Sequence, residues 1–95
     1  MEFEWDAQKA ASNVAKHGVT FAEAMTVFGD PLEVAITDPD HSEDECRFLS
    51  MGLSETGRLL VVAYPEREER IRIINARGPT PRERKQYEST GSPRR

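Results

Sequence analysis

The clearest alternation of polar and hydrophobic positions lies in residues 70–77, where arginines and isoleucines follow one another along the chain. Because successive side chains of a strand point to opposite faces, Arg70 and Arg72 are expected on one face. Ile71 and Ile73 are expected on the other face, against the core. The pattern therefore predicts a strand over 70–77 whose outer face carries arginines.

A helix over 80–87 is predicted directly after this strand. A Gly-Pro pair interrupts the strand, and Thr80 then has the chemistry of an N-cap, with Pro81 at the first helical position and Glu83 completing a capping box. Arginines thus stand on the strand, at its exit and on the helix, which is a way to hold several guanidinium groups around a phosphate. The spacing alone favours a simpler interpretation, the solvated outer face of a sheet.

The first third of the chain shows helical spacing. A short strand over 2–5 precedes a helix over 7–16, which Asp6 caps and Gly18 ends as a left-handed residue. The positions expected to form its inner face are Ala7, Ala10, Ala11 and Val14. The positions expected on its polar side are Lys9, Asn13 and Lys16.

A second helix is predicted to start at Thr20, with Glu23 completing another capping box. Its core positions follow the helical period and are Phe21, Ala24, Met25 and Phe28.

Strands are predicted over 32–37, 46–53 and 58–64, ahead of the strand at 70–77. Residues 59–63 are apolar on both faces, which is typical of a central strand covered on both sides. Helices segregated from consecutive strands indicate an α+β fold, with two N-terminal helices packed on a four-stranded antiparallel meander and a C-terminal helix. We expect a single domain over 1–88 and a flexible tail over 89–95.

Composition narrows the class of protein. The 95 residues are 37% hydrophobic and 32% charged, which suits one small globular domain. No apolar run approaches the roughly 20 residues that span a bilayer, and the acidic N-terminus lacks the features of a signal peptide. These features predict a cytoplasmic protein without membrane contact. The single cysteine, Cys46, is expected to be an inert thiol in a strand.

The acidic segment 38–45 holds His41 among five carboxylates. A metal site and a solvated loop are both conceivable there. The loop is favoured because the ligand register of a hard-cation site is absent, so neither metal nor cofactor is predicted.

Charge is unevenly distributed along the chain. Residues 1–66 carry thirteen acidic and four basic side chains, a net charge of −9, whereas 67–95 carry nine basic and four acidic side chains, a net of +5. The overall charge of −4 argues against a general nucleic-acid binder. The basic C-terminal third is nevertheless enough for a local phosphate site.

The residues that could carry chemistry are the arginines, His17, Tyr87 and a few carboxylates, since no Gly-rich phosphate loop, zinc signature or nucleophile elbow is present. Such a set fits metal-free phosphoryl transfer on RNA, in which a 2′-hydroxyl attacks its own phosphate while guanidinium groups neutralise the developing charge. His17 stands beside Gly18 at a predicted helix end, and the residues alone favour a role in capping or packing there.

Residues 2–88 contain three groups of residues whose identities and spacing, taken together, form a specific pattern. The first comprises Glu4-Trp5-Asp6, Lys9, Asn13, Lys16-His17-Gly18-Val19 and Phe21. The second comprises Val27-Phe28, Asp30-Pro31, Asp40-His41-Ser42, Arg47, Met51-Gly52, Ser54 and Gly57-Arg58. The third comprises Arg70-Ile71-Arg72-Ile73-Ile74, Ala76-Arg77, Glu83 and Tyr87-Glu88. Together they resemble the BrnT family of type II toxins.

The resemblance implies a RelE-like fold and a small ribonuclease that inhibits translation. It also implies a partner, a BrnA-type antitoxin of the ribbon-helix-helix class. That antitoxin would neutralise the toxin in a complex that represses its own operon, and the antitoxin would make the DNA contact.

The residues of this chain that match the family pattern are expected to have the roles of the corresponding family residues. Arg72 and Arg77 are expected to stabilise the transition state, and His17 or Tyr87 to transfer protons. The residues expected to contact RNA are Arg47, Arg58, Arg70 and Lys16. An alternative, structural role ties the first and last helices to the sheet through Lys9, Asn13 and Glu83.

Three positions depart from the family pattern. Asn75 replaces a common serine, Gly78 a basic residue and Pro79 an alanine. Losing the basic side chain removes one phosphate contact, and proline removes a backbone donor. These departures motivate an alternative function, a catalytically attenuated member that acts as an antitoxin-binding co-repressor. A small DNA-binding module using the last helix is a third possibility, which the net charge disfavours.

Overall fold

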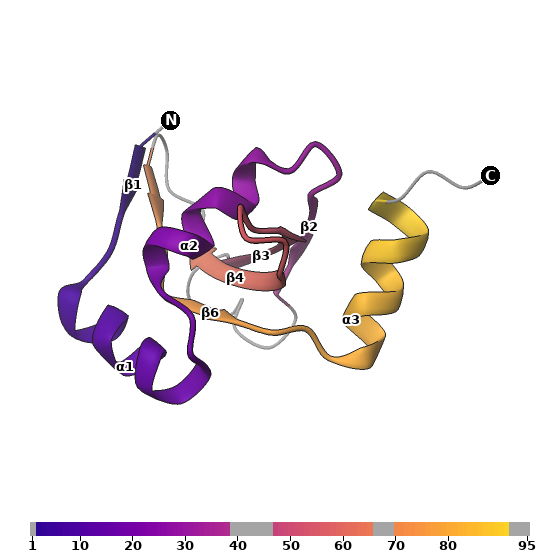
Figure 1. The fold of residues 1–95 in the computed structure, drawn as a ribbon. Coiled ribbons are helices and arrows are strands. Elements are labelled where there is room, and N and C mark those ends of the chain that lie inside the picture. Colours follow the sequence, from indigo (N-terminus) through magenta and orange to yellow (C-terminus); the bar gives the residue numbers. More distant parts are fainter. Residues whose placement is uncertain (1, 39–46, 66–69, 92–95) are drawn as a thin grey trace.

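The computed structural model describes residues 2–38, 47–65 and 70–91 (Figure 1). Its elements in chain order are β1 (Glu2–Glu4), α1 (Ala7–His17), α2 (Phe21–Met25), the 3-10 turn η1 (Thr26–Gly29), β2 (Val34–Thr37), β3 (Arg47–Leu53), β4 (Leu59–Pro65), β5 (Arg70–Arg72), β6 (Asn75–Arg77), α3 (Pro81–Gln86) and the π-helical turn η2 (Tyr87–Gly91). This order confirms the predicted α+β class. The predicted acidic loop with His41, and Cys46, lie outside the described residues.

The main sheet is antiparallel, with the strand order β2–β3–β4–β6. β4 is paired on both sides, so that Val62 lies opposite Ser50 of β3 and Ala76 of β6. The side chains of Leu60 and Val62 enter one hydrophobic cluster, and those of the alternating residues enter another. This arrangement confirms the prediction of a central strand with cover on both faces.

The segment 70–77 forms two strands in two sheets, so the prediction of one continuous strand is wrong. β5 pairs in parallel with β1, whereas β6 joins the main sheet beside β4. Arg70 and Arg72 therefore belong to a different sheet from Arg77 (Figure 1).

The chain passes from one sheet to the other between two neighbouring residues, Ile73 and Ile74. The Ile73 N–H donates to the Glu4 carbonyl oxygen at 3.0 Å, while the Ile74 N–H donates to the Ala63 carbonyl oxygen at 3.0 Å. The Ile73 side chain is fully buried on the helix side of the sheet, and Ile74 packs on the opposite side. Burial of both isoleucines outweighs continuation of a single strand, because each side chain reaches a separate apolar cluster.

The short parallel pair of β1 and β5 has a charged face and an apolar face. Its register places Glu2 opposite Arg70, Phe3 opposite Ile71 and Glu4 opposite Arg72. Arg70 contacts both glutamates, at 3.2 Å and 3.1 Å, and Arg72 contacts Glu4 at 3.5 Å. The prediction that the isoleucines face the core is confirmed, and the arginines lie against the glutamates of β1.

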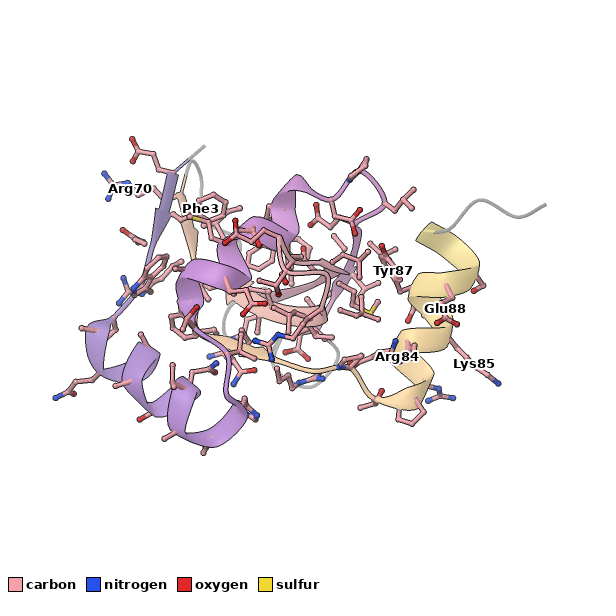
Figure 2. The ribbon with its side chains drawn as sticks, viewed as in Figure 1. Phe3, Arg70, Arg84, Lys85, Tyr87 and Glu88 are labelled. Carbon is pink, nitrogen blue, oxygen red and sulfur yellow. The ribbon has the colours of Figure 1, made fainter. Side chains whose placement is uncertain are left out.

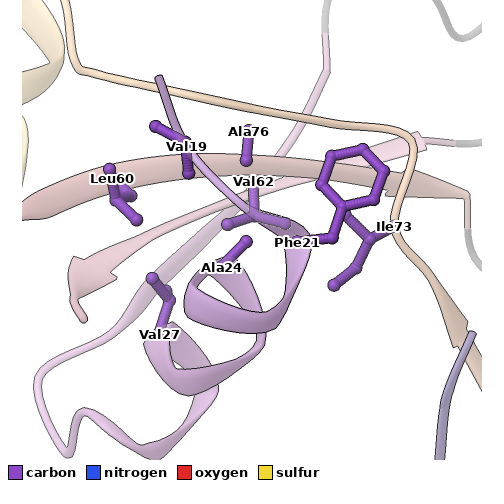
Figure 3. Close-up of a cluster of buried hydrophobic side chains, with 8 residues drawn as sticks. All are labelled: Val19, Phe21, Ala24, Val27, Leu60, Val62, Ile73 and Ala76. Carbon is purple, nitrogen blue, oxygen red and sulfur yellow. The ribbon is translucent and has the colours of Figure 1, made fainter. Parts of the chain in front are cut away.

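One face of the main sheet is closed by α2 and η1 (Figure 3). The buried side chains there are Val19, Phe21, Ala24, Val27, Leu60, Val62, Ile73 and Ala76. Phe21 and Ala24 were predicted from helical spacing, and Met25 and Phe28 pack against the cluster from its margin. The second helix thus meets the core as its sequence predicts.

The most buried residue of the first helix is Asn13, which the sequence places on its polar side. Val14 is 44% exposed and Ala7 and Ala11 are exposed, whereas Asn13 is only 4% exposed. The Asn13 side chain donates to the Ala76 carbonyl at 2.8 Å and accepts from the Ala76 N–H at 3.1 Å, so it pairs with the edge of β6 as a neighbouring strand would. Asn13 can be buried because its amide is hydrogen-bonded. Of the predicted inner face, Ala10 packs against the core as predicted, whereas the prediction is wrong for the other three residues.

The opposite face of the sheet is covered by the C-terminal part of the chain. Leu49, Met51, Leu59, Val61 and Ala63 form a second cluster with Tyr87. α3 itself buries no residue and lies at the other end of the molecule from α1 (Figure 1). The predicted capping box of α3 is confirmed.

The last helical turn runs to Gly91, inside the segment that the sequence predicts as a tail, and 92–95 lie outside the described residues. In the described part of the chain, no helix has the length and apolar character needed to cross a membrane.

Candidate functional site

A cleft of about 660 Å³ lies on the sheet face opposite α2, beside α3. Its apolar lining residues are Ile36, Leu49, Ala63 and Ile74. Its polar lining residues are Lys9, Asp38, Arg47, Asn75, Arg77, Arg82, Glu83 and Gln86. We term it the sheet cleft.

Strand alternation explains why cations meet in the sheet cleft. On β3, Arg47 shares a face with Leu49, and on β6 Arg77 points away from the core residue Ala76. These two arginines come from different strands but line the same cleft. The structure therefore brings together two of the predicted site residues.

Arg77 is held by a carboxylate fork. Its two terminal nitrogens donate to the two Glu83 oxygens at 2.8 Å and 3.0 Å. Glu83 also accepts from the Thr80 N–H at 2.9 Å, so the capping box that starts α3 orients the carboxylate. The hydrogen bonds from Arg77 hold the pKa of Glu83 below its usual range, and Glu83 raises the pKa of Arg77. Both groups are therefore charged at neutral pH.

Three further cations line the sheet cleft. Within the described residues, Lys9, Arg47 and Arg82 make no side-chain hydrogen bond or ion pair, so their charges are not matched by a carboxylate contact. The sequence placed arginines on this helix but assigned no site role to Arg82, which follows the Thr80-Pro81 helix start and so lies beside the strand exit. A basic cleft over an apolar floor can hold a phosphate and the sugar or base attached to it.

A second cleft, of about 430 Å³, lies at the β3–β4 hairpin. Its lining residues are His17, Val19, Leu53, Gly57, Arg58, Leu59, Leu60, Gly78, Pro79 and Arg84. We term it the hairpin cleft. His17 and Arg58, two predicted site residues, are thus brought together, but in a different cleft from Arg47 and Arg77.

Arg58 is fixed at the hairpin cleft by Glu23. Its Nε donates to Glu23 Oε2 at 3.1 Å, and its Nη2 donates to Glu23 Oε1 at 2.6 Å and to the Gly18 carbonyl at 3.3 Å. The hydrogen bond from Arg58, with others from Thr56 and Ser54, lowers the pKa of Glu23 to about 2. Only half of the capping box predicted at Thr20 forms, because the Glu23 carboxylate makes these contacts in place of the Thr20 N–H.

Tyr87 lies in neither cleft. It is 6% exposed and its hydroxyl donates to Asp30 Oδ2 at 2.7 Å. Burial first, and then the Asp30 carboxylate, raise its pKa to about 12. These contacts favour an anchoring role, because the neutral phenol ties the turn after α3 to the loop before β2. Figure 2 shows Tyr87 on the side of the last helix that faces the sheet.

The remaining predicted RNA-binding and catalytic positions lie outside both clefts. Arg70 and Arg72 pair with β1 glutamates, and Lys16 is exposed in the last turn of α1. Of the three positions with a proposed structural role, Asn13 and Glu83 make tying contacts and Lys9 lines the sheet cleft. Among the residues that the structure describes, no group of three or more His, Cys, Asp or Glu side chains is placed to hold a metal ion.

Comparison with known proteins agrees with the sequence resemblance. A family described as "Ribonuclease toxin, BrnT, of type II toxin-antitoxin system" matches residues 5–83. Among solved structures, the 1.1 Å crystal structure of the ribonuclease toxin BrnT of Brucella abortus is similar, with a TM-score of 0.61 and 23% identity over 84% of this chain and 97% of that chain. No curated protein sequence matches the chain.

The family match spans most of the chain, including the first helix, all four strands of the main sheet and the start of α3. The structural likeness independently supports the fold. The chain therefore belongs to the BrnT family of ribonuclease toxins of type II toxin–antitoxin systems.

Proposed function

We propose that the chain is a metal-independent endoribonuclease with a RelE-like fold that cleaves RNA in the sheet cleft and thereby inhibits translation. The observation that carries the proposal is the convergence of Arg77 with Lys9, Arg47 and Arg82 over one apolar floor. Guanidinium groups suit this chemistry because they neutralise charge that develops on phosphate oxygens without transferring a proton.

The reaction begins when the ribose 2′-hydroxyl attacks the adjacent phosphorus. The O2′–P bond forms as the P–O5′ bond breaks, which leaves a 2′,3′-cyclic phosphate and a free 5′-hydroxyl. Arg77 and Arg47 contact the non-bridging oxygens as negative charge increases on them. Arg82, on the first turn of α3, contacts the neighbouring backbone.

Proton transfer is assigned to titratable groups of the same cleft. Asp38 accepts the proton of the 2′-hydroxyl and Lys9 protonates the leaving 5′-oxygen, since both side chains line the sheet cleft. His17 and Tyr87, of which one or the other is expected from the family resemblance to transfer protons, lie away from these groups.

Cleavage of single-stranded RNA by the purified protein in the presence of EDTA tests the proposal. Arg77→Ala is expected to lower kcat/KM by roughly 100-fold or more, the size of effect seen when one transition-state donor is lost. Arg72→Ala, the matched arginine of β5, is expected to stay within about twofold of the parent. Equal losses in both variants would restore the site predicted from the sequence, and cleavage that requires a divalent cation would contradict metal independence.

The partner is proposed to be a BrnA-like antitoxin of the ribbon-helix-helix class, acting in the cytoplasm. The family's place in type II systems supports a protein antitoxin. Expression of the chain alone is expected to arrest growth, and co-expression with the ribbon-helix-helix protein encoded beside it is expected to restore growth. Arrest that persists in the presence of that protein would contradict the pairing.

A second candidate function, an attenuated co-repressor, is favoured by one contact. Glu83 already occupies the bidentate face of Arg77 that a phosphate would use, and Gly78 offers no replacement cation. This function predicts harmless expression and tighter operator binding by the antitoxin when the chain is added. RNA cleavage by the pure chain, lost in Arg77→Ala, would exclude it.

A further inference from the structure

Both clefts are lined by basic side chains, but the hairpin cleft differs from the sheet cleft in having no carboxylate in its described lining. Its described lining holds His17, Arg58 and Arg84 and no carboxylate, whereas the sheet cleft includes Asp38 and Glu83. The proposed cleavage reaction uses none of these three side chains. The hairpin cleft therefore suits an anion that is held without being transformed.

The free charge of the hairpin cleft rests mainly on Arg84. Arg58 is matched by Glu23, which lies behind it, while the Arg84 side chain makes no hydrogen bond or ion pair within the described residues. Figure 2 shows Arg84 on the side of α3 that faces the sheet, with Lys85 directed away from it. Arg84 is thus placed to contact a ligand in the cleft.

The hairpin cleft also has an apolar lining. Leu53 is 43% exposed and lies with Leu59 and Val19 beside the cations. An exposed leucine next to guanidinium groups matches a ligand that has both an apolar face and a phosphate. A nucleotide has both parts, whereas an inorganic anion would leave the leucine unused.

The two clefts adjoin one another along a single segment of chain. Arg77 lines the sheet cleft, Gly78 and Pro79 line the hairpin cleft, Arg82 lines the sheet cleft and Arg84 the hairpin cleft. Along the strand exit and the first turns of α3, no more than two residues separate a residue of one cleft from the next residue of the other. A single strand of nucleic acid that passes over this segment can contact both clefts.

We propose that the hairpin cleft is a subsite for a nucleotide that flanks the scissile phosphate of a single-stranded RNA, with Arg84 and His17 on its phosphate and Leu53 against its base. In catalysis, the subsite would position the substrate, and this role rests on the proposed ribonuclease function. Arg84, missed by sequence reasoning, is its main phosphate contact.

The first experiment measures binding apart from cleavage. A fluorescein-labelled, mixed-sequence 2′-O-methyl RNA, which lacks the attacking hydroxyl, is titrated with the full chain over a salt series and followed by anisotropy. Arg84→Ala is expected to weaken binding roughly five- to tenfold and to reduce the slope of log K against log salt by about 0.7, the value for one phosphate contact on a single strand. Lys85→Ala removes the same charge from the outer side of α3 and is the matched control.

Several outcomes would overturn the subsite. They are equal effects of Arg84→Ala and Lys85→Ala, no binding of the RNA by the parent chain, or a loss of antitoxin affinity in Arg84→Ala while RNA affinity is unchanged. The last outcome would assign the cleft to the protein partner. RNA binding that depends on Arg84 in a chain that cleaves nothing would uphold the subsite and reject the proposed ribonuclease activity.

The second experiment tests the apolar part and the positioning role. Leu53→Ser is expected to weaken binding of the same RNA roughly threefold, whereas Leu32→Ser, at another exposed leucine, is expected to leave it unchanged. In cleavage assays, Arg84→Ala is expected to raise KM for a long RNA with kcat unchanged, and to have no effect on a dinucleotide that contains only the scissile phosphate. A fall in kcat on the dinucleotide would contradict a flanking site.

Discussion

The two faces of the main sheet use the same central strand in different ways. On the helix face, Leu60 and Val62 of β4 are sealed beneath α2, which contributes the buried Phe21 and Ala24. On the cleft face, Ala63 of the same strand forms part of an open floor beside α3. One strand therefore supplies a closed core on one face and part of a binding surface on the other.

The difference lies in how the covering helices are attached. α2 is attached through the buried side chains of Phe21 and Ala24, in addition to the ion pair of Glu23 with Arg58. α3 buries no residue and is attached at its ends by polar contacts, Arg77 with Glu83 at the start and Tyr87 with Asp30 beyond its last turn. A helix attached at its ends can cover a sheet and still leave a cleft, so the polar contacts of α3 create the space for a ligand.

The largest expected effect on the free energy of unfolding comes from truncating one buried side chain on the helix face, which we compare with one on the cleft face. Phe21→Ala removes a fully buried side chain from beneath α2 and is expected to lower the free energy of unfolding by about 3–5 kcal/mol. Ile36→Ala on the cleft floor, where the side chain is half-buried, is expected to lower it by about 1 kcal/mol. Urea denaturation measures both values, and similar losses would show that the cleft face is as tightly packed as the helix face.

The next effect concerns the edge of the sheet. Asn13→Ala leaves the buried N–H and carbonyl of Ala76 without their partner and is expected to cost about 2–4 kcal/mol. Ser12→Ala, an exposed neighbour on the same helix, serves as the control and is expected to change little. If Asn13→Ala lowered the free energy of unfolding no more than the control does, water would be replacing the Asn13 amide at β6.

A smaller effect tests the attachment of α3. Tyr87→Phe removes the hydrogen bond to Asp30 and is expected to cost about 1–2 kcal/mol at neutral pH. Because the folded-state pKa of Tyr87 is about 12, above the ordinary 10.0, its contribution is complete below pH 10 and declines as pH rises towards 12.

Unfolding measured against pH should therefore show a smaller alkaline loss of stability in Tyr87→Phe than in the parent. The pKa of Tyr64 is also raised by burial, so part of the alkaline loss remains in the variant. An unchanged alkaline profile would contradict the anchoring role of Tyr87.

The smallest effect is expected at α1. Val14→Lys is expected to change the free energy of unfolding by no more than about 0.5 kcal/mol, because the side chain is largely exposed. Val27→Lys places the same substitution in the closed core and is expected to prevent folding or cost several-fold more. A large cost at Val14 would restore the inner face predicted from helical spacing.

Local signals in the sequence predicted much of the fold. Gly18 ends α1 in the left-handed conformation, and the Thr80 capping box starts α3, because both depend on residues within one turn. The apolar run at 59–63 also identified the central strand, since a strand buried on both faces needs no distant partner to be recognised. These features follow from short-range chemistry.

Long-range pairing could not be predicted from the same signals. Asn13 has the pattern of a surface residue, and only its contact with Ala76, 63 residues away, makes it a buried one. The alternation of Arg and Ile continues through Ile73, so nothing local marks the change of sheet at Ile74. Both errors arise where a partner distant in sequence determines the burial or pairing.

The predicted site residues also divide into those placed by local strand alternation and those placed by partners distant in sequence. Arg47 and Arg77 meet as strand alternation allows, while Arg72 and Tyr87 are drawn to Glu4 and Asp30. The catalytic and RNA-binding roles of all these residues stay predictions. Their positions show which variants discriminate between the site predicted from the sequence and the sheet cleft.

The change of sheet between Ile73 and Ile74 restricts how the length of this segment can vary in evolution. With a side-chain period of two, deleting or inserting one residue there while β5 keeps its register would turn β6 over. Arg77 would then point into the apolar core and Ala76 into the cleft. A change of a single codon in the length of this segment would remove the site in one step, so we expect homologous toxins to preserve the number of residues between β5 and β6.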